Sequence, residues 1–117
     1  MATRVIPTQV HAVLDYVTGG ALVAAPRLLG MHGTTAGKVL DLAGGIATAQ
    51  SLLTDYELGL VKVIPMRTHL TLDAASGALV AASPWLFGFA GNGRRYWLPH
   101  VLVGTTEILA AALTKSR

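Results

Sequence analysis

Two identical pairs of ionisable residues occur in this 117-residue chain. His11 and Asp15 are four positions apart, and His69 and Asp73 repeat that spacing. Residues four apart share one face of a helix, so each carboxylate can hold one imidazole nitrogen and leave the other nitrogen free. Imidazole and carboxylate groups together bind divalent metals, and at membrane depth they also mark proton or ion pathways.

A third acid, Glu107, lies at a comparable depth, about two helical turns before the end of the last apolar stretch. The candidate metal ligands are therefore His11, Asp15, His69, Asp73 and Glu107. The favoured interpretation is a structural role in which the His–Asp pairs organise helix packing, and a divalent metal site and a proton or ion pathway are the alternatives. Haem held between the two histidines is disfavoured, because the neighbouring carboxylates would bring negative charge to the porphyrin edge.

The elements that must position these residues form an internal duplication. Residues 11–30 read HAVLDYVTGGALVAAPRLLG and residues 69–88 read HLTLDAASGALVAASPWLFG, which align without a gap at an offset of 58. The following segments align at an offset of 60, which pairs Thr54 with Thr114. Glu107 breaks this symmetry, because the aligned residue is Ala47. The pattern predicts two copies of a two-helix unit.

Composition and apolar runs predict a membrane protein. Only 13% of the residues are charged, against about 25% in soluble domains, and the mean hydropathy is +0.54. Four apolar stretches approach the length that crosses a bilayer: 10–29, 36–54, 68–87 and 97–114. We therefore expect an all-α, four-helix transmembrane bundle of two parallel two-helix repeats. It would form one domain over residues 1–117, with repeat one about 8–56, a linker about 55–66 and repeat two about 67–115.

The basic residues are scattered over loops and termini, which argues against nucleic-acid binding because that needs a clustered basic face. Two helices per unit place both termini and the linker on one side, with five basic residues against four on the other. This weak bias predicts cytoplasmic termini. The expected location is the prokaryotic inner membrane. The expected partners are the lipid bilayer and either further copies of the chain or a larger membrane complex. The opening apolar stretch contains His11 and Asp15, so we do not expect it to be a cleaved signal peptide.

The segment Ser83-Pro84-Trp85 resembles the signature of the SPW-repeat family of small bacterial and archaeal membrane proteins. The resemblance implies two transmembrane helices per repeat, with this motif in the first helix, and it implies no biochemical activity. The first unit departs from the signature and keeps only the proline, Pro26. Physically, the serine hydroxyl can bond a carbonyl that the proline leaves free, and the tryptophan suits a membrane interface.

Enzyme motifs are missing from the sequence. It has no cysteine, no phosphate-binding glycine loop, no H-E-x-x-H zinc motif and no G-x-S-x-G nucleophile elbow. The sequence therefore favours a structural or accessory protein over an enzyme, and a divalent metal is the cofactor that its residues could hold.

Overall fold

A computed structural model of the chain describes residues 4–116. Residues 1–3 lie outside this range, as does Arg117, which was one of the five basic residues counted above. The described residues form four α-helices and a short 3₁₀ helix: α1 Thr8–Leu28, α2 Thr35–Leu52, α3 Met66–Leu86, η1 Ala90–Asn92 and α4 Arg94–Leu113. The predicted all-α chain of four helices is confirmed. The largest difference in bounds is at the start of α4, which begins at Arg94 rather than at Trp97.

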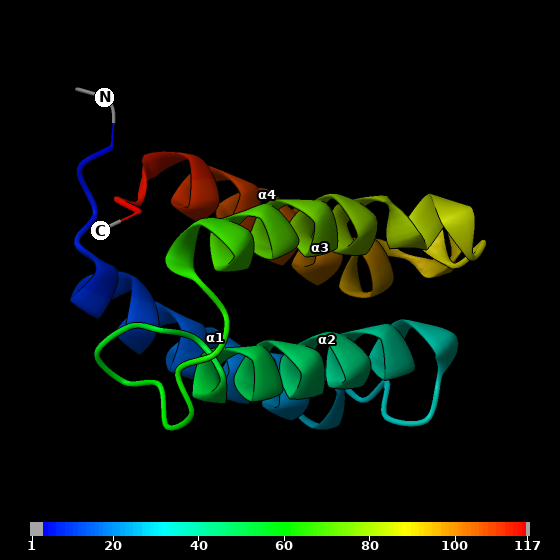
Figure 1. The fold of residues 1–117 in the computed structure, drawn as a ribbon. Coiled ribbons are helices and arrows are strands. Elements are labelled where there is room, and N and C mark those ends of the chain that lie inside the picture. Colours follow the sequence, from blue (N-terminus) through cyan, green and yellow to red (C-terminus); the bar gives the residue numbers. More distant parts are fainter. Residues whose placement is uncertain (1–3, 117) are drawn as a thin grey trace.

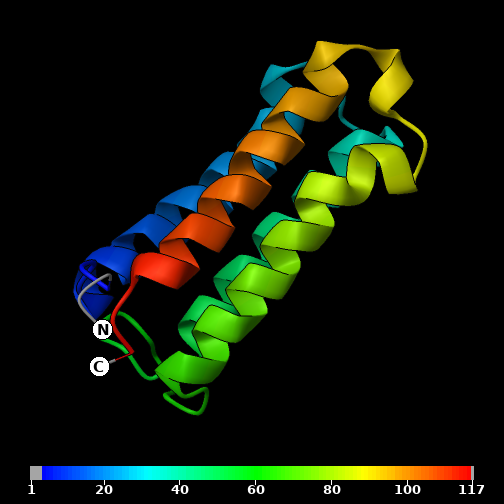
Figure 2. The same ribbon diagram turned by 90° about the horizontal axis from the view of Figure 1, so that it is seen from above.

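The helices pack as two antiparallel pairs (Figure 1). Helices α1 and α2 form one pair, and α3 and α4 form the other. Seen from above, α4 lies along α1 and α3 lies along α2 (Figure 2). The start of α1, the end of α4 and the linker between α2 and α3 all lie at the same end of the bundle. Side chains from these three segments therefore lie close together at this end of the bundle.

Glycines allow the two helices of each pair to pack closely. A Cβ atom added to Gly44 on α2 would lie 2.8 Å from the carbonyl oxygen of Gly19 on α1. In the second pair, a Cβ added to Gly77 would lie 2.6 Å from the carbonyl oxygen of Gly104. These four glycines are repeat equivalents, so the duplication preserves the contact as well as the sequence.

Helices α1 and α3 end in the same way. Each has a proline in its last turn and then a glycine in the left-handed region, Gly30 at φ 70° and Gly88 at φ 75°. The amide that follows each glycine donates to the proline carbonyl at 2.9 Å, in the geometry of a Schellman cap. Both prolines therefore lie inside the last turn and do not interrupt the helix before it.

Polar and apolar side chains are distributed unusually in this bundle. The fully buried residues include three histidines, two serines and two threonines, whereas large apolar side chains are exposed along every helix, among them Val17, Leu42, Leu79 and Leu109. Over residues 4–116, no helix combines the length and the apolarity needed to cross a membrane. The transmembrane part of the expected fold class stays a prediction.

Candidate functional site

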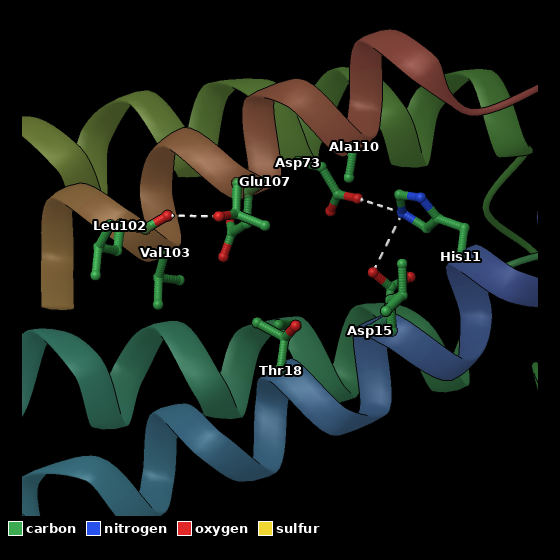
Figure 3. Close-up of a pocket in the computed structure, with 11 residues that line it drawn as sticks. His11, Asp15, Thr18, Asp73, Leu102, Val103, Glu107 and Ala110 are labelled. Carbon is green, nitrogen blue, oxygen red and sulfur yellow. Dashed lines mark hydrogen bonds and ion pairs between the residues drawn. The ribbon is translucent and has the colours of Figure 1, made fainter. Parts of the chain in front are cut away.

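The two His–Asp pairs meet between α1 and α3. The His11 Nε2 atom lies 2.9 Å from an Asp73 carboxylate oxygen and 3.2 Å from one of Asp15. The His69 Nε2 atom lies 2.9 Å from Asp15 and 3.1 Å from Asp73. Figure 3 shows both carboxylates pointing toward the same nitrogen of the His11 ring. Each imidazole therefore touches both carboxylates, and the four residues form one His–Asp cluster.

The other ring nitrogen of each histidine contacts a threonine hydroxyl. His11 Nδ1 lies 2.7 Å from Thr114 Oγ1, and His69 Nδ1 lies 2.6 Å from Thr54 Oγ1. Each hydroxyl donates its own proton to the backbone carbonyl four residues earlier in its helix. The hydroxyl must then accept from the ring, so Nδ1 carries a hydrogen in both histidines.

The threonines are held in place where α2 and α4 end. Thr114 forms an isolated β-bridge with Ile6, next to the start of α1, and Thr54 forms the equivalent bridge with Ile64, next to the start of α3. Thr114, at the end of α4, thus lies beside the start of α1, which carries His11. Thr54, at the end of α2, lies in the same way beside the start of α3, which carries His69. Backbone pairing at this end of the bundle fixes the ring orientation.

Each carboxylate also accepts a hydrogen bond from outside the cluster. Gln50 on α2 donates to Asp73 at 2.9 Å, and the hydroxyl of Tyr56 in the linker donates to Asp15 at 2.8 Å. Burial raises the pKa of the Tyr56 hydroxyl, which keeps it protonated as a donor. The two acids are therefore positioned from both sides, by the histidines and by these donors.

Both histidines of the cluster are buried, each with 1% of its surface exposed. The Nε2 atom of His69 is fully buried, and its polar contacts among residues 4–116 are the two carboxylates. One ligand atom from each of the four residues lies within 4.8 Å of the others, so the donor set suits a small cation. The carboxylates occupy the space between the rings, whose centroids are 5.4 Å apart, so a porphyrin does not fit there.

Glu107 does not join this group of four. It lies on α4 in the wall of a cavity that also touches His11, Asp15 and Asp73 (Figure 3). Over the described part of the chain, its carboxylate takes part in no hydrogen bond or ion pair. The five predicted candidates are thus neighbours, but Glu107 faces the space beside the cluster.

The remaining histidines are elsewhere. His100 is buried at the opposite half of the bundle, where its Nε2 donates to the carbonyl of Ala36 at 2.9 Å and so joins α4 to α2. His32 is exposed in the loop after α1, 4.0 Å from Asp41. Asp41 pairs with Arg27 at 2.9 Å. None of these contacts reaches the His–Asp cluster.

The comparison with protein families gives one clear result. The model of the SPW repeat domain matches residues 9–114, which include the four helices apart from Thr8 and contain the whole His–Asp cluster. The chain belongs to the SPW-repeat family. No curated protein and no solved structure gives a significant match. The family resemblance inferred from the Ser-Pro-Trp signature is therefore confirmed.

The SPW motif itself lies at the far end of α3 from the cluster. Pro84 has no amide hydrogen to give to the carbonyl of Val80, and the Ser83 hydroxyl donates to that carbonyl at 2.7 Å instead. Trp85 is 60% exposed, and its ring centroid lies 6.3 Å from that of Trp97 on α4. The motif thus completes a helix end and displays an aromatic pair, and it contributes nothing to the cluster.

Two features of the site were absent from the sequence-based prediction. The threonines that orient the histidines were seen only as aligned residues, although their shared offset of 60 beside a duplicated histidine could have indicated a partner role. Tyr56 has no counterpart in the duplication, and nothing in the sequence pointed to its bond with Asp15.

Proposed function

We propose that this SPW-repeat chain is a small integral membrane protein, one domain of two repeats, that holds a divalent metal ion in its His–Asp cluster. The proposed membrane location is supported by which side chains are exposed and which are buried. Large apolar residues are exposed on every helix and buried positions include histidine, serine and threonine. Histidines and aspartates that face inward lower the average apolarity of a helix without placing a polar group in lipid.

Cell fractionation tests the location. We expect the protein to stay in the membrane fraction after an alkaline carbonate wash and to need detergent for extraction. Recovery as a soluble, monodisperse protein without detergent would contradict the membrane proposal. The chain has no cysteine, so single cysteines at Ser116 and Asn92, labelled with an impermeant maleimide in whole cells, report which side carries the termini. We expect the Asn92 variant alone to be labelled, in line with cytoplasmic termini.

The metal part rests on the fixed hydrogen on Nδ1. Because each Nδ1 donates to a threonine hydroxyl, a neutral ring presents its lone pair on Nε2. Both Nε2 atoms face the two carboxylates, at separations of 2.9 to 3.2 Å. This is the arrangement in which metal-binding histidines are commonly held, with the distal nitrogen donating to an outer group. The convergence of both Nε2 atoms on the two carboxylates, with each Nδ1 held by a threonine, is the observation that carries the proposal.

Charge and size favour a divalent transition metal, with zinc as the first choice. Two ionised aspartates and two neutral imidazoles carry a formal charge of −2, which one divalent ion balances. Zinc takes four nitrogen and oxygen ligands at about 2.0–2.2 Å in a tetrahedral site. Such ligands lie about 3.3–3.5 Å apart, and the present N···O separations of 2.9 to 3.2 Å need only a small expansion.

A purely structural role is the second candidate, and one observation favours it. The 2.9 Å separations are typical of charged hydrogen bonds between an imidazolium and a carboxylate. Two protonated histidines and two aspartates would then form a neutral, buried ion cluster that joins the repeats. This reading predicts that metal changes neither the stability nor the composition of the protein.

Metal analysis separates the two candidates. We expect protein purified in mild detergent without chelator to carry one zinc per chain, and His11→Ala and His69→Ala to carry none. His32→Ala is the matched control, because His32 is exposed in a loop outside the cluster, and it should keep the metal. Absence of metal in the wild type, with no zinc binding by calorimetry, would leave the structural role.

A further inference from the structure

A cavity of about 190 Å³ opens between α1 and α4 beside the His–Asp cluster (Figure 3). Its apolar wall includes Leu14 on α1 and Leu102 and Val103 on α4. The carboxylates of Asp15 and Asp73 form its polar end. Glu107 lies in the wall between this polar end and the apolar side chains. The cavity therefore combines an apolar body with an acidic end.

The two repeats differ at two positions that line this cavity, Ala110 and Glu107. Gln50 on α2 extends to Asp73, whereas its repeat equivalent on α4 is Ala110, whose short side chain leaves the space beside Asp15 unfilled. The second difference puts Glu107 into that space where the first repeat has Ala47. Ala110, in place of a glutamine, thus leaves space in the cavity, and Glu107, in place of an alanine, adds a carboxylate to it.

The equivalent groove between α2 and α3 provides an internal comparison. Part of its lining consists of repeat partners of the cavity wall, Leu42 for Leu102 and Ala43 for Val103, and the rest continues along α3 as far as Phe87. None of the residues that line it is charged, and none belongs to the His–Asp cluster. Only the α1–α4 side has both the acid and access to the cluster, so simple packing of a duplicated bundle does not account for it.

The charge in the cavity indicates the sign of its ligand. The His–Asp cluster is neutral with a divalent ion, and it is equally neutral with two imidazolium rings. Glu107 adds a carboxylate with no partner among residues 4–116, so its ionised form leaves the cavity with one unbalanced negative charge. A monovalent cation would compensate it. A carboxylate in apolar surroundings is costly without such a partner.

The volume and the apolar wall indicate the rest of the ligand. An apolar cavity of about 150 Å³ holds a benzene ring, so 190 Å³ has room for a ring with a short substituent. We infer that the α1–α4 cavity binds a small organic cation, a protonated amine with one ring or branched chain, whose ammonium group contacts Glu107. This inference goes beyond the metal proposal and holds whether or not the cluster contains an ion.

Benzylammonium is the probe, because it joins an aromatic ring to an amine that is cationic at neutral pH. We expect saturable calorimetric binding to the wild-type protein in detergent, measured against empty micelles. Benzyl alcohol has the same ring without the charge and should bind at least about tenfold more weakly, which corresponds to about 1.4 kcal/mol. The titration is repeated in zinc-containing and in chelator-treated buffer, and benzylammonium binding should persist in both. A failure of the metal proposal is thereby distinguished from a failure of the cavity proposal.

Two variants locate the site. Glu107→Gln keeps the shape and removes the charge, and it should weaken benzylammonium at least about tenfold while leaving benzyl alcohol unchanged. Ala110→Gln restores the side chain of the other repeat and should abolish binding of both probes. Glu57→Gln is the control, because Glu57 is in the linker bonded to Thr8, away from the cavity.

The proposal would be overturned by any of three results. The first is no saturable binding of benzylammonium up to about 10 mM, a range in which even a weak Kd corresponds to several kcal/mol of binding free energy. The second is equal binding of benzyl alcohol and benzylammonium. The third is unchanged binding of benzylammonium to Glu107→Gln. The last two would indicate an apolar or water-filled cavity in which the acid serves another purpose.

Discussion

His11 lies closer to Asp73, on the other repeat, than to Asp15 on its own helix, at 2.9 Å against 3.2 Å. The reciprocal pair behaves in the same way, since His69 is 2.9 Å from Asp15 and 3.1 Å from Asp73. Each histidine therefore contacts its own aspartate and, at a shorter distance, the aspartate of the other repeat. The local pairs thus also form a buried link between the two halves of the bundle.

Removing one carboxylate of the cluster should destabilise the bundle. We expect Asp73→Asn to lower the free energy of unfolding in detergent by about 3 kcal/mol, because loss of one partner leaves the others buried and poorly compensated. Asp41→Asn is the control, since Asp41 makes an exposed pair with Arg27, and it should cost less than about 1 kcal/mol. Equal losses in the two variants would show that the cluster does not link the repeats.

The threonine hydroxyls should control metal affinity through the histidines. Thr114→Val keeps the side-chain shape and removes the acceptor for His11 Nδ1, so zinc affinity should fall by about 10–100-fold. Helix content measured by circular dichroism should not change. Thr105→Val on the exposed side of the same helix is the matched control. Unchanged zinc affinity in Thr114→Val would mean that the threonine does not fix the ring.

Close helix packing should tolerate no added methyl group at the glycine contacts. Gly104→Ala would place a Cβ against the Gly77 carbonyl and 2.7 Å from the Cβ of Ala81, and we expect it to cost about 1–3 kcal/mol. Gly45→Ala on α2 meets no atom within 4 Å and should be neutral or stabilising by up to about 1 kcal/mol. Thermal or denaturant unfolding of the pair decides, and a neutral Gly104→Ala would contradict the packing described above.

The serine of the SPW motif should contribute through a single hydrogen bond. Ser83→Ala leaves the Val80 carbonyl without its donor, and we expect a loss of about 1 kcal/mol. Ser76→Ala, on the same helix and without a hydrogen bond among the described residues, should change stability less. Equal changes in stability in the two variants would show that the hydrogen bond from Ser83 to Val80 makes no net contribution to stability.

The sequence predicted the fold largely because it contains the fold twice. Matching prolines and glycines located the ends of α1 and α3, and the apolar runs located all four helices to within a few residues. The start of α4 was set too late because Arg94 and Arg95 read as loop charges. Helical geometry tolerates such charges in a first turn, so an apolar run alone underestimates the length of a helix.

The site was predicted in its residues but not in its connections. The spacing of four placed each histidine beside its own aspartate, whereas its contact with the aspartate of the other repeat depends on how α1 and α3 pack. The hydrogen bond from Gln50 to Asp73 likewise depends on how α2 packs against α3. The contribution of Tyr56 could not be anticipated, because the linker that carries it has no counterpart in the other repeat.

The central claim is that His11 and His69 are neutral metal ligands, and ¹⁵N NMR of the histidine side chains during a zinc titration tests it most directly. We predict that, at neutral pH and with one equivalent of zinc, Nδ1 of both rings stays protonated while both Nε2 signals move to the position of a zinc-bound nitrogen. His32 should not respond. Both nitrogens of His11 and His69 protonated, and unchanged by zinc, would contradict the metal site and identify the cluster as a structural link between charged groups.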